Sequence, residues 1–145
     1  MSEFGFAGEE FVLVRYYEHG KSGSGDNPSD PAGIESADVV SIPAGLMVEK
    51  AMVAIDTAIT GSTAINLGDD DDADGYVPTA SLTLGTPAVY GYGPDESGAY
   101  LNASGESRVK YYDSSSSGKE VKLAVTGAST AGKFRVILKG IYLGR

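Results

Sequence analysis

Alternation of apolar and polar residues is the clearest signal along this chain. Val121, Leu123 and Val125 face one way if the segment is extended, and charged or small residues lie between them. This spacing of two is typical of half-buried β-strands. Residues 133–143 form a second such segment after a loop of small residues, which predicts a closing antiparallel hairpin. Residues 11–17 are rich in β-branched and aromatic side chains and predict a further strand.

The segment 46–59 fits two patterns. Some of its apolar residues have helical spacing, whereas Val53, Ile55, Thr57 and Ile59 follow the spacing of two with β-branched side chains. We favour strands with an irregularity near Glu49 and Lys50. About eight strands joined by frequent turns then predict an all-β fold, an antiparallel β-sandwich or barrel.

A long loop separates the first predicted strand from the rest of the chain. Residues 20–38 contain Pro28, Pro31 and several glycines, a composition that does not sustain a regular element. We therefore predict an N-terminal arm and linker over residues 1–36 and a β-sandwich body over residues 37–145.

Composition and charge exclude several function classes. The chain has 145 residues, 20 glycines and no cysteine, so disulfides, thiolate metal sites and cysteine nucleophiles are absent. Its net charge is −9, which repels nucleic acid and anionic membranes. No apolar run reaches the roughly 18 to 20 residues of a membrane-spanning helix. Neither nucleic acid nor a membrane is an expected partner.

The charge is unevenly distributed along the chain. Residues 1–107 contain 3 basic and 18 acidic side chains, whereas residues 108–145 contain 8 basic and 2 acidic ones. A bipolar subunit can dock through complementary faces. The candidate interface consists of basic residues of the last third, namely Arg108, Lys110, Lys122, Lys133, Arg135 and Lys139. The alternative is that the strands interleave and the charges mix on the folded surface.

Five acidic residues crowd into positions 69–74. Asp70, Asp72 and Asp74, followed by Gly75, fit the first half of a calcium loop, but Ser81 stands where a bidentate glutamate is needed. The run is typical of a solvated acidic loop. The alternative is a weak, millimolar calcium site at these three aspartates, and no other cofactor is expected.

No catalytic constellation is evident. His19 is the only histidine, so any Ser-His-Asp or histidine-metal mechanism would have to use it, and it lies beside the glycine-rich linker. We expect a solvated residue at a strand end. The chain is therefore not expected to be an enzyme.

Four short segments carry a resemblance to a known class of proteins. They are Ile42-Pro43-Ala44-Gly45, residues 51–59, Ile65-Asn66-Leu67-Gly68 and Asp72-Ala73-Asp74-Gly75-Tyr76. This pattern resembles the head decoration, or cement, proteins of tailed bacteriophages. The resemblance implies a jelly-roll-like β-sandwich on the capsid exterior, commonly a homotrimer, with an extended arm that clasps neighbours and with no catalytic residues.

The expected function is therefore structural. The protein would be made in the host cytoplasm and would bind the major capsid protein across capsomers, stabilising the shell. The alternative is a carbohydrate- or calcium-dependent β-sandwich module of a phage spike or fibre.

Overall fold

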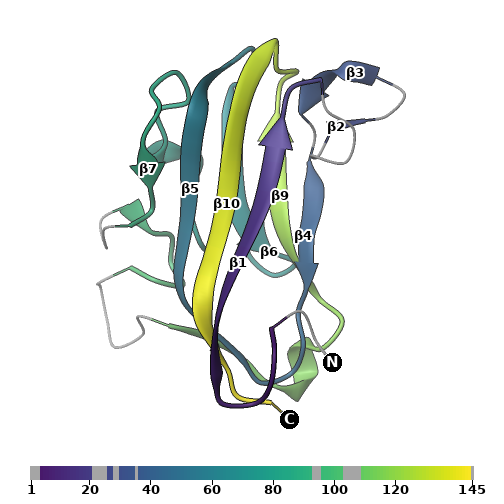
Figure 1. Cartoon of the computed structure of the whole chain (residues 1–145), viewed down its shortest axis with the longest axis vertical. Coiled ribbons are helices and arrows are strands. Elements are labelled where there is room, and N and C mark those ends of the chain that lie inside the picture. Colours follow the sequence, from purple (N-terminus) through teal and green to yellow (C-terminus); the bar gives the residue numbers. More distant parts are fainter. Residues whose placement is uncertain are drawn as a thin grey trace.

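We describe the protein from a computed structural model (Figure 1). The structure describes residues 4–20, 26, 27, 30–34, 36–92, 96–102 and 109–144, with the backbone alone for 26, 27 and 30–33. The 3-10 turns η1 (Thr79–Ser81) and η3 (Ser114–Ser116) lie in connections. The strands are β1 (Glu9–Glu18), β2 (Asp26–Asn27), β3 (Asp30–Ile34), β4 (Ala37–Ser41), β5 (Leu46–Thr60), β6 (Ala64–Asp69), β7 (Val89–Tyr90), β8 (Lys110–Tyr112), β9 (Glu120–Thr126) and β10 (Ala131–Tyr142).

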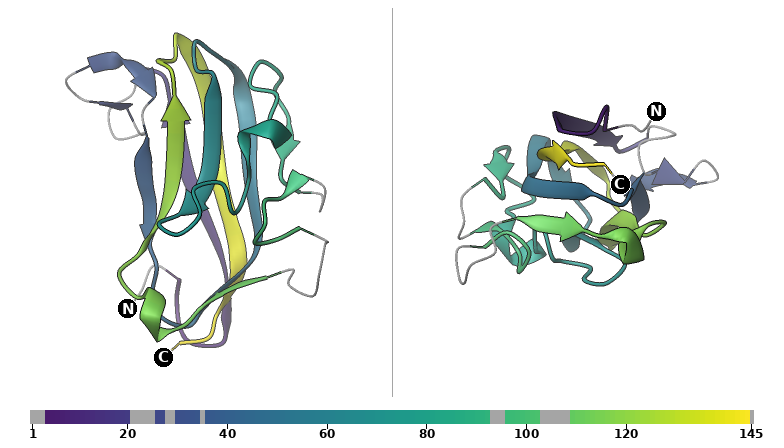
Figure 2. Two further views of the ribbon diagram at one scale, coloured as in Figure 1. Left: turned by 180° about the vertical axis from the view of Figure 1, so that it is seen from behind. Right: turned by 90° about the horizontal axis from the view of Figure 1, so that it is seen from below.

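These strands form two antiparallel sheets packed face to face (Figures 1 and 2). The large sheet has the order β1-β10-β5-β7, with β8 also paired to β5, and the small sheet has the order β4-β9-β6. β2 and β3 form a separate hairpin. The predicted all-β sandwich is confirmed, while its jelly-roll-like connectivity stays a prediction. The predicted closing hairpin is wrong, because β9 pairs with β4 and β6 in the small sheet, whereas β10 pairs with β1 and β5 in the large sheet.

The core lies between the two sheets and follows from strand alternation. Phe134, Val136 and Leu138 of β10 point inward and are almost fully buried, and Val121 and Leu123 of β9 meet them from the small sheet. Side chains at alternate positions of each strand therefore face the same core. Among the described residues, no helix is long and apolar enough to cross a membrane.

The segment 46–59 is one long strand with a bulge. In the pairing of β5 with β10, Lys50 lies opposite Lys139 and Val48 opposite Gly140, so Glu49 is the extra residue. The favoured strand interpretation and its irregularity near Glu49 and Lys50 are confirmed. Gly140 is required here, because a Cβ atom at this position would collide with the carbonyl oxygen of Met47.

The prediction of a detachable N-terminal arm is wrong for residues 9–18, which form β1. All ten residues of β1 pair in continuous register with β10, and Phe11, Leu13 and Tyr17 are buried in the core. Tyr17 stacks on Phe134 with ring centroids 5.2 Å apart. β1 is therefore an edge strand of the large sheet and part of the sandwich, because its apolar side chains complete the core.

Candidate assembly surface

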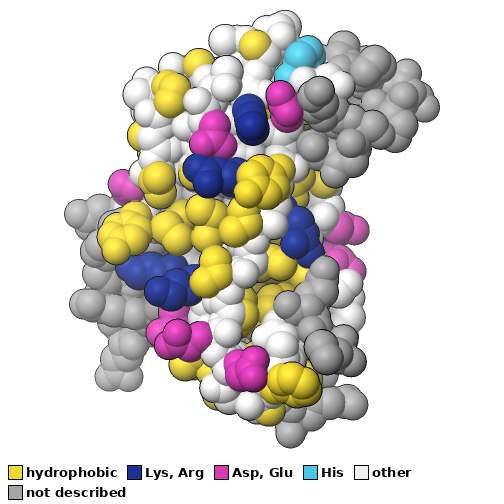
Figure 3. Space-filling model, viewed as in Figure 1, with side chains coloured by type: hydrophobic (Ala, Val, Ile, Leu, Met, Phe, Trp, Pro, Cys, Tyr) yellow, Lys and Arg dark blue, Asp and Glu magenta, His cyan; other side chains and the backbone are white. Residues whose placement is uncertain are grey.

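The outer face of the large sheet carries an apolar band. Because their neighbours in β1 point inward, Val12, Val14 and Tyr16 point outward, and Val12 and Tyr16 are 63% and 58% exposed. Register places Val14 opposite Ile137 of β10, which in turn lies opposite Met52 of β5. Figure 3 shows hydrophobic side chains running across the middle of this face, with basic groups above and below them.

Charged side chains of both signs surround this band. Arg135 donates to both carboxylate oxygens of Asp56, at 3.0 and 2.9 Å. Lys50 donates to the carbonyl of Tyr92 and lies 5.0 Å from the centroid of its ring. The face carries Lys50, Lys133, Arg135 and Lys139 together with Glu10, Glu18, Glu49 and Asp56. The formal charges of these eight side chains sum to zero, although the whole chain carries −9.

A hollow of about 430 Å³ opens on the same side of the molecule. It is lined by Glu10 of β1, Lys139 of β10, and Glu49 and Lys50 of β5, with Leu101 and other apolar atoms beside them. The bulge at Glu49 brings two acidic and two basic side chains to one place. Charged side chains from three strands of the large sheet therefore meet at this hollow.

The structure separates the basic residues that the sequence grouped as an interface. Lys133, Arg135 and Lys139 lie on β10, whereas Lys122 lies on β9 of the small sheet and bonds Asp70 at 2.7 Å. Arg108 lies outside the described residues. For the others, ion pairs such as Arg135–Asp56 join the acidic and basic parts of the chain, so the charges mix on the surface.

Lys110 also has an intramolecular role. Its ammonium lies 4.1 Å from the ring centroid of Tyr100 and 5.3 Å from that of Tyr112. Such cation–π contacts hold the side chain over the aromatic faces. Lys110 is thus part of the packing around Tyr100 and does not extend the set on β10.

The acidic loop does not bring Asp70, Asp72 and Asp74 together. Asp70 accepts from Lys122 and from the N–H of Glu120, and these bonds lower the pKa of its carboxyl. The pKa of Asp72 is raised, chiefly by a hydrogen bond to the carboxyl of Asp74. Within the described part of the chain, no three His, Cys, Asp or Glu side chains are grouped to hold a metal ion.

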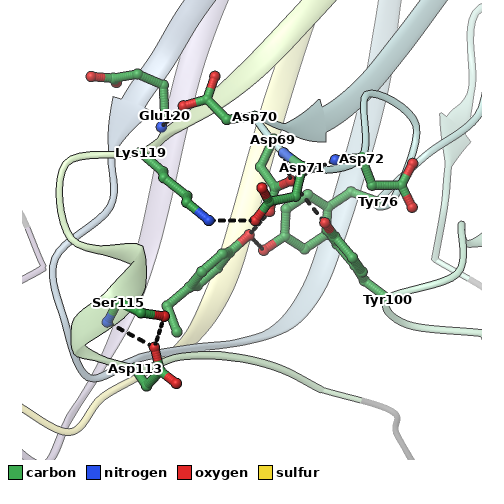
Figure 4. Close-up of polar contacts among 11 residues, drawn as sticks. Asp69, Asp70, Asp71, Asp72, Tyr76, Tyr100, Asp113, Ser115, Lys119 and Glu120 are labelled. Atoms are coloured by element: carbon green, nitrogen blue, oxygen red, sulfur yellow. Dashed lines mark hydrogen bonds and ion pairs between the residues drawn. The ribbon is translucent and has the colours of Figure 1, made fainter.

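Asp69, the first acid of the run, is instead buried, with 3% of its surface exposed. One oxygen accepts from the hydroxyl of Tyr100 at 2.7 Å and from two loop N–H groups, and the other accepts from Tyr112 at 2.6 Å (Figure 4). The hydroxyl of Tyr76 lies 2.6 Å from that of Tyr112. Burial raises the pKa of all three tyrosines.

This network joins the two sheets, because Asp69 ends β6 and Tyr112 ends β8. The prediction of a solvated acidic loop is therefore wrong for Asp69. A signal was present: Ile65, Leu67 and Asp69 share one parity along β6, so the aspartate occupies an inward position. Its role is to pin the acidic loop and β8 to the core.

The only histidine is half-buried and has a partner, so the expected solvated strand end is wrong. His19 Nδ1 lies 3.0 Å from the hydroxyl of Ser129, and this buried hydroxyl also accepts from the N–H of Ile34 at 2.8 Å. The contact ties the loop between β9 and β10 to the ends of β1 and β3. His19 therefore contributes to the packing of these chain segments against one another.

No protein-family model and no curated protein sequence matches this chain. Among solved structures, the chain resembles one in the capsid asymmetric unit of cyanophage Pam1, with 17% identity, a TM-score of 0.56, and coverage of 96% of this chain and 89% of that one. A chain of the acidic stable capsid of Helicobacter pylori bacteriophage KHP30 matches with 14% identity and a TM-score of 0.44. The Pam1 likeness confirms the resemblance to phage virion proteins at the level of the fold.

Proposed function

We propose that this protein is a structural component of a phage virion that decorates the capsid exterior and stabilises it by binding across capsomers. The observation that carries the proposal is the fold likeness to a chain of the Pam1 capsid asymmetric unit, which spans nearly the whole of both chains. In this role the protein acts without catalysis or a cofactor, is made in the host cytoplasm, and binds the major capsid protein as a homotrimer.

The architecture suits a mechanical role. A sandwich whose two sheets are joined by a continuous core and by the Asp69 network resists distortion. A partly apolar outer face offers a surface for protein contacts. A rigid body bound over a boundary between capsomers adds contacts that must break before the shell opens, and it thereby opposes the pressure of packaged DNA.

The test uses virions of the phage that encodes this chain, with the gene intact or deleted. We expect the chain on purified heads in a fixed ratio to the major capsid protein, and mass measurement of the free protein should give a trimer. Heads that lack the chain should release DNA at a lower temperature, and added purified protein should restore the release temperature. The control is heads incubated with an unrelated protein of similar charge.

The spike or fibre alternative gives a different result. Deletion would then reduce adsorption to host cells while the temperature of DNA release stayed unchanged, and the chain would be found on tails or spikes instead of heads. A chain that never co-purifies with particles would refute a virion role altogether.

A further inference from the structure

We infer that the outer face of the large sheet is the surface that meets the capsid shell, and that it binds an apolar protein surface there. This inference rests on the proposed function and deepens it, because it selects one face of the molecule and one type of contact. The residues that carry it are Val12, Val14, Tyr16, Met52 and Ile137.

The two outer faces of the sandwich differ in chemistry. On the small sheet, the outward positions carry polar side chains such as Asp38, Asn66 and Lys122, as expected for a solvated face. On the large sheet, the middle row of Val14, Ile137 and Met52 is apolar and half-buried. Figure 3 shows hydrophobic side chains in the middle of this face. A contiguous apolar patch rimmed by polar groups is typical of a protein-binding site.

The distribution of charged side chains supports the choice of the same face. Among the described residues, the outward positions of β1, β10 and β5 carry four basic and four acidic side chains, so their formal charges sum to zero. A neutral face approaches a protein partner without net attraction or repulsion, and the contact then depends on removing apolar surface from water. The strength of binding to the shell should consequently change little with salt concentration. Docking through a cluster of basic side chains would instead weaken as salt increases.

A second copy of this face is a poor partner. If two copies pack about a two-fold axis through Ile137, the row of Arg135 in one falls on the row of Lys139 in the other. Cations then meet cations at both ends of the band, which disfavours the pairing. A two-fold pair through this face is therefore disfavoured, and within the proposed function we assign the face to the shell.

The area of this face is smaller than a complete stable interface, as expected for one of several contacts made by a protein that bridges capsomers. Ten residues along β1 and three strands across give about 33 Å by about 14 Å, or on the order of 500 Å². A stable protein interface buries about 800 Å² on each partner. One subunit therefore needs a further contact for stable attachment, as a molecule that spans capsomers would have.

The test replaces two exposed apolar residues while net charge is conserved. The variant combines Val12→Glu with Tyr16→Lys, and the matched control combines Ser117→Glu with Thr126→Lys, exposed positions away from the large sheet. We expect the first variant to lose about tenfold or more in retention on capsids and the control to be retained like wild type. Wild-type retention should change less than about twofold between 0.1 and 1 M NaCl.

Circular dichroism and thermal melting first establish that each variant folds. If Val12→Glu with Tyr16→Lys does not fold, Val12→Thr with Tyr16→Thr replaces it, since threonine is a good strand former. Retention of the folded variant at the wild-type level would overturn the inference, as would wild-type release by salt. Loss of retention together with an altered oligomeric mass would show that the face joins copies, and would also overturn it. Absence of wild-type binding would instead refute the proposed function.

Discussion

At the scale of single residues, Asp69 is the most demanding feature of this structure. Burying an ionised carboxylate is costly unless hydrogen bonds replace its water. Here two tyrosine hydroxyls and two backbone N–H groups donate to it, and Tyr76 extends the chain of bonds through Tyr112. Each of these hydrogen bonds to the buried carboxylate therefore stabilises the folded state more than a hydrogen bond to an exposed carboxylate would.

Removing one hydroxyl from this network tests its contribution. Tyr112→Phe leaves the buried carboxylate of Asp69 without one of its donors, and hydrogen bonds to charged groups contribute about 1.5–3 kcal/mol. We expect a loss of that size in the free energy of unfolding, measured by urea denaturation. Tyr111→Phe is the matched control, because its ring is 52% exposed, and it should change stability by less than about 0.5 kcal/mol. Equal losses in both variants would contradict a stabilising network.

At the scale of elements, strand alternation predicted most of what the structure contains. β9, β10 and the bulged β5 follow from local patterns, because the spacing of two fixes which side chains face the core. The pairing of the strands did not follow. β9 and β10 lie in different sheets instead of one hairpin, and β1 joins the large sheet instead of forming an arm. Its partner β10 lies more than a hundred residues further on, and no local pattern states which distant strand a segment will join.

Alternate residues of β1 allow a direct test of its place in the core. Leu13→Ala removes a buried side chain and should lower the free energy of unfolding by about 2–5 kcal/mol. Val12→Ala, on the exposed side of the same strand, should cost less than about 1 kcal/mol. Urea denaturation of both variants distinguishes a core strand from a detachable arm. Similar small effects would restore the prediction of an arm.

At the scale of the whole molecule, the arrangement of the strands decides the surface charge. Basic β10 lies between β1 and β5, which supply Glu18 and Asp56 as near neighbours. The division of charge along the sequence therefore disappears on the large-sheet face. The apolar band could not be predicted from the sequence either. It forms only when β1, β10 and β5, which come from different parts of the chain, pair in the observed register.

Tyrosines in both halves of the sandwich also link global stability to alkaline pH. Burial raises the pKa of Tyr17 to about 12, and the pKa values of Tyr76, Tyr100 and Tyr112 are raised as well. In the unfolded chain all four titrate near 10. Above that pH the folded state holds more protons than the unfolded state, so stability falls as pH rises. Below about pH 10, the contribution of these groups is fully present.

We therefore expect the urea midpoint to decline steeply between about pH 10 and pH 12. Tyr17→Phe keeps the stacking on Phe134 and removes the ionisable hydroxyl, so it should reduce this decline by on the order of 2–3 kcal/mol at pH 12. Tyr16→Phe, at an exposed neighbouring position, should leave the decline as in wild type. If the urea midpoints of Tyr17→Phe and Tyr16→Phe declined equally with pH, the Tyr17 hydroxyl would ionise as readily in the folded chain as in the unfolded chain. That result would contradict the raised pKa of Tyr17.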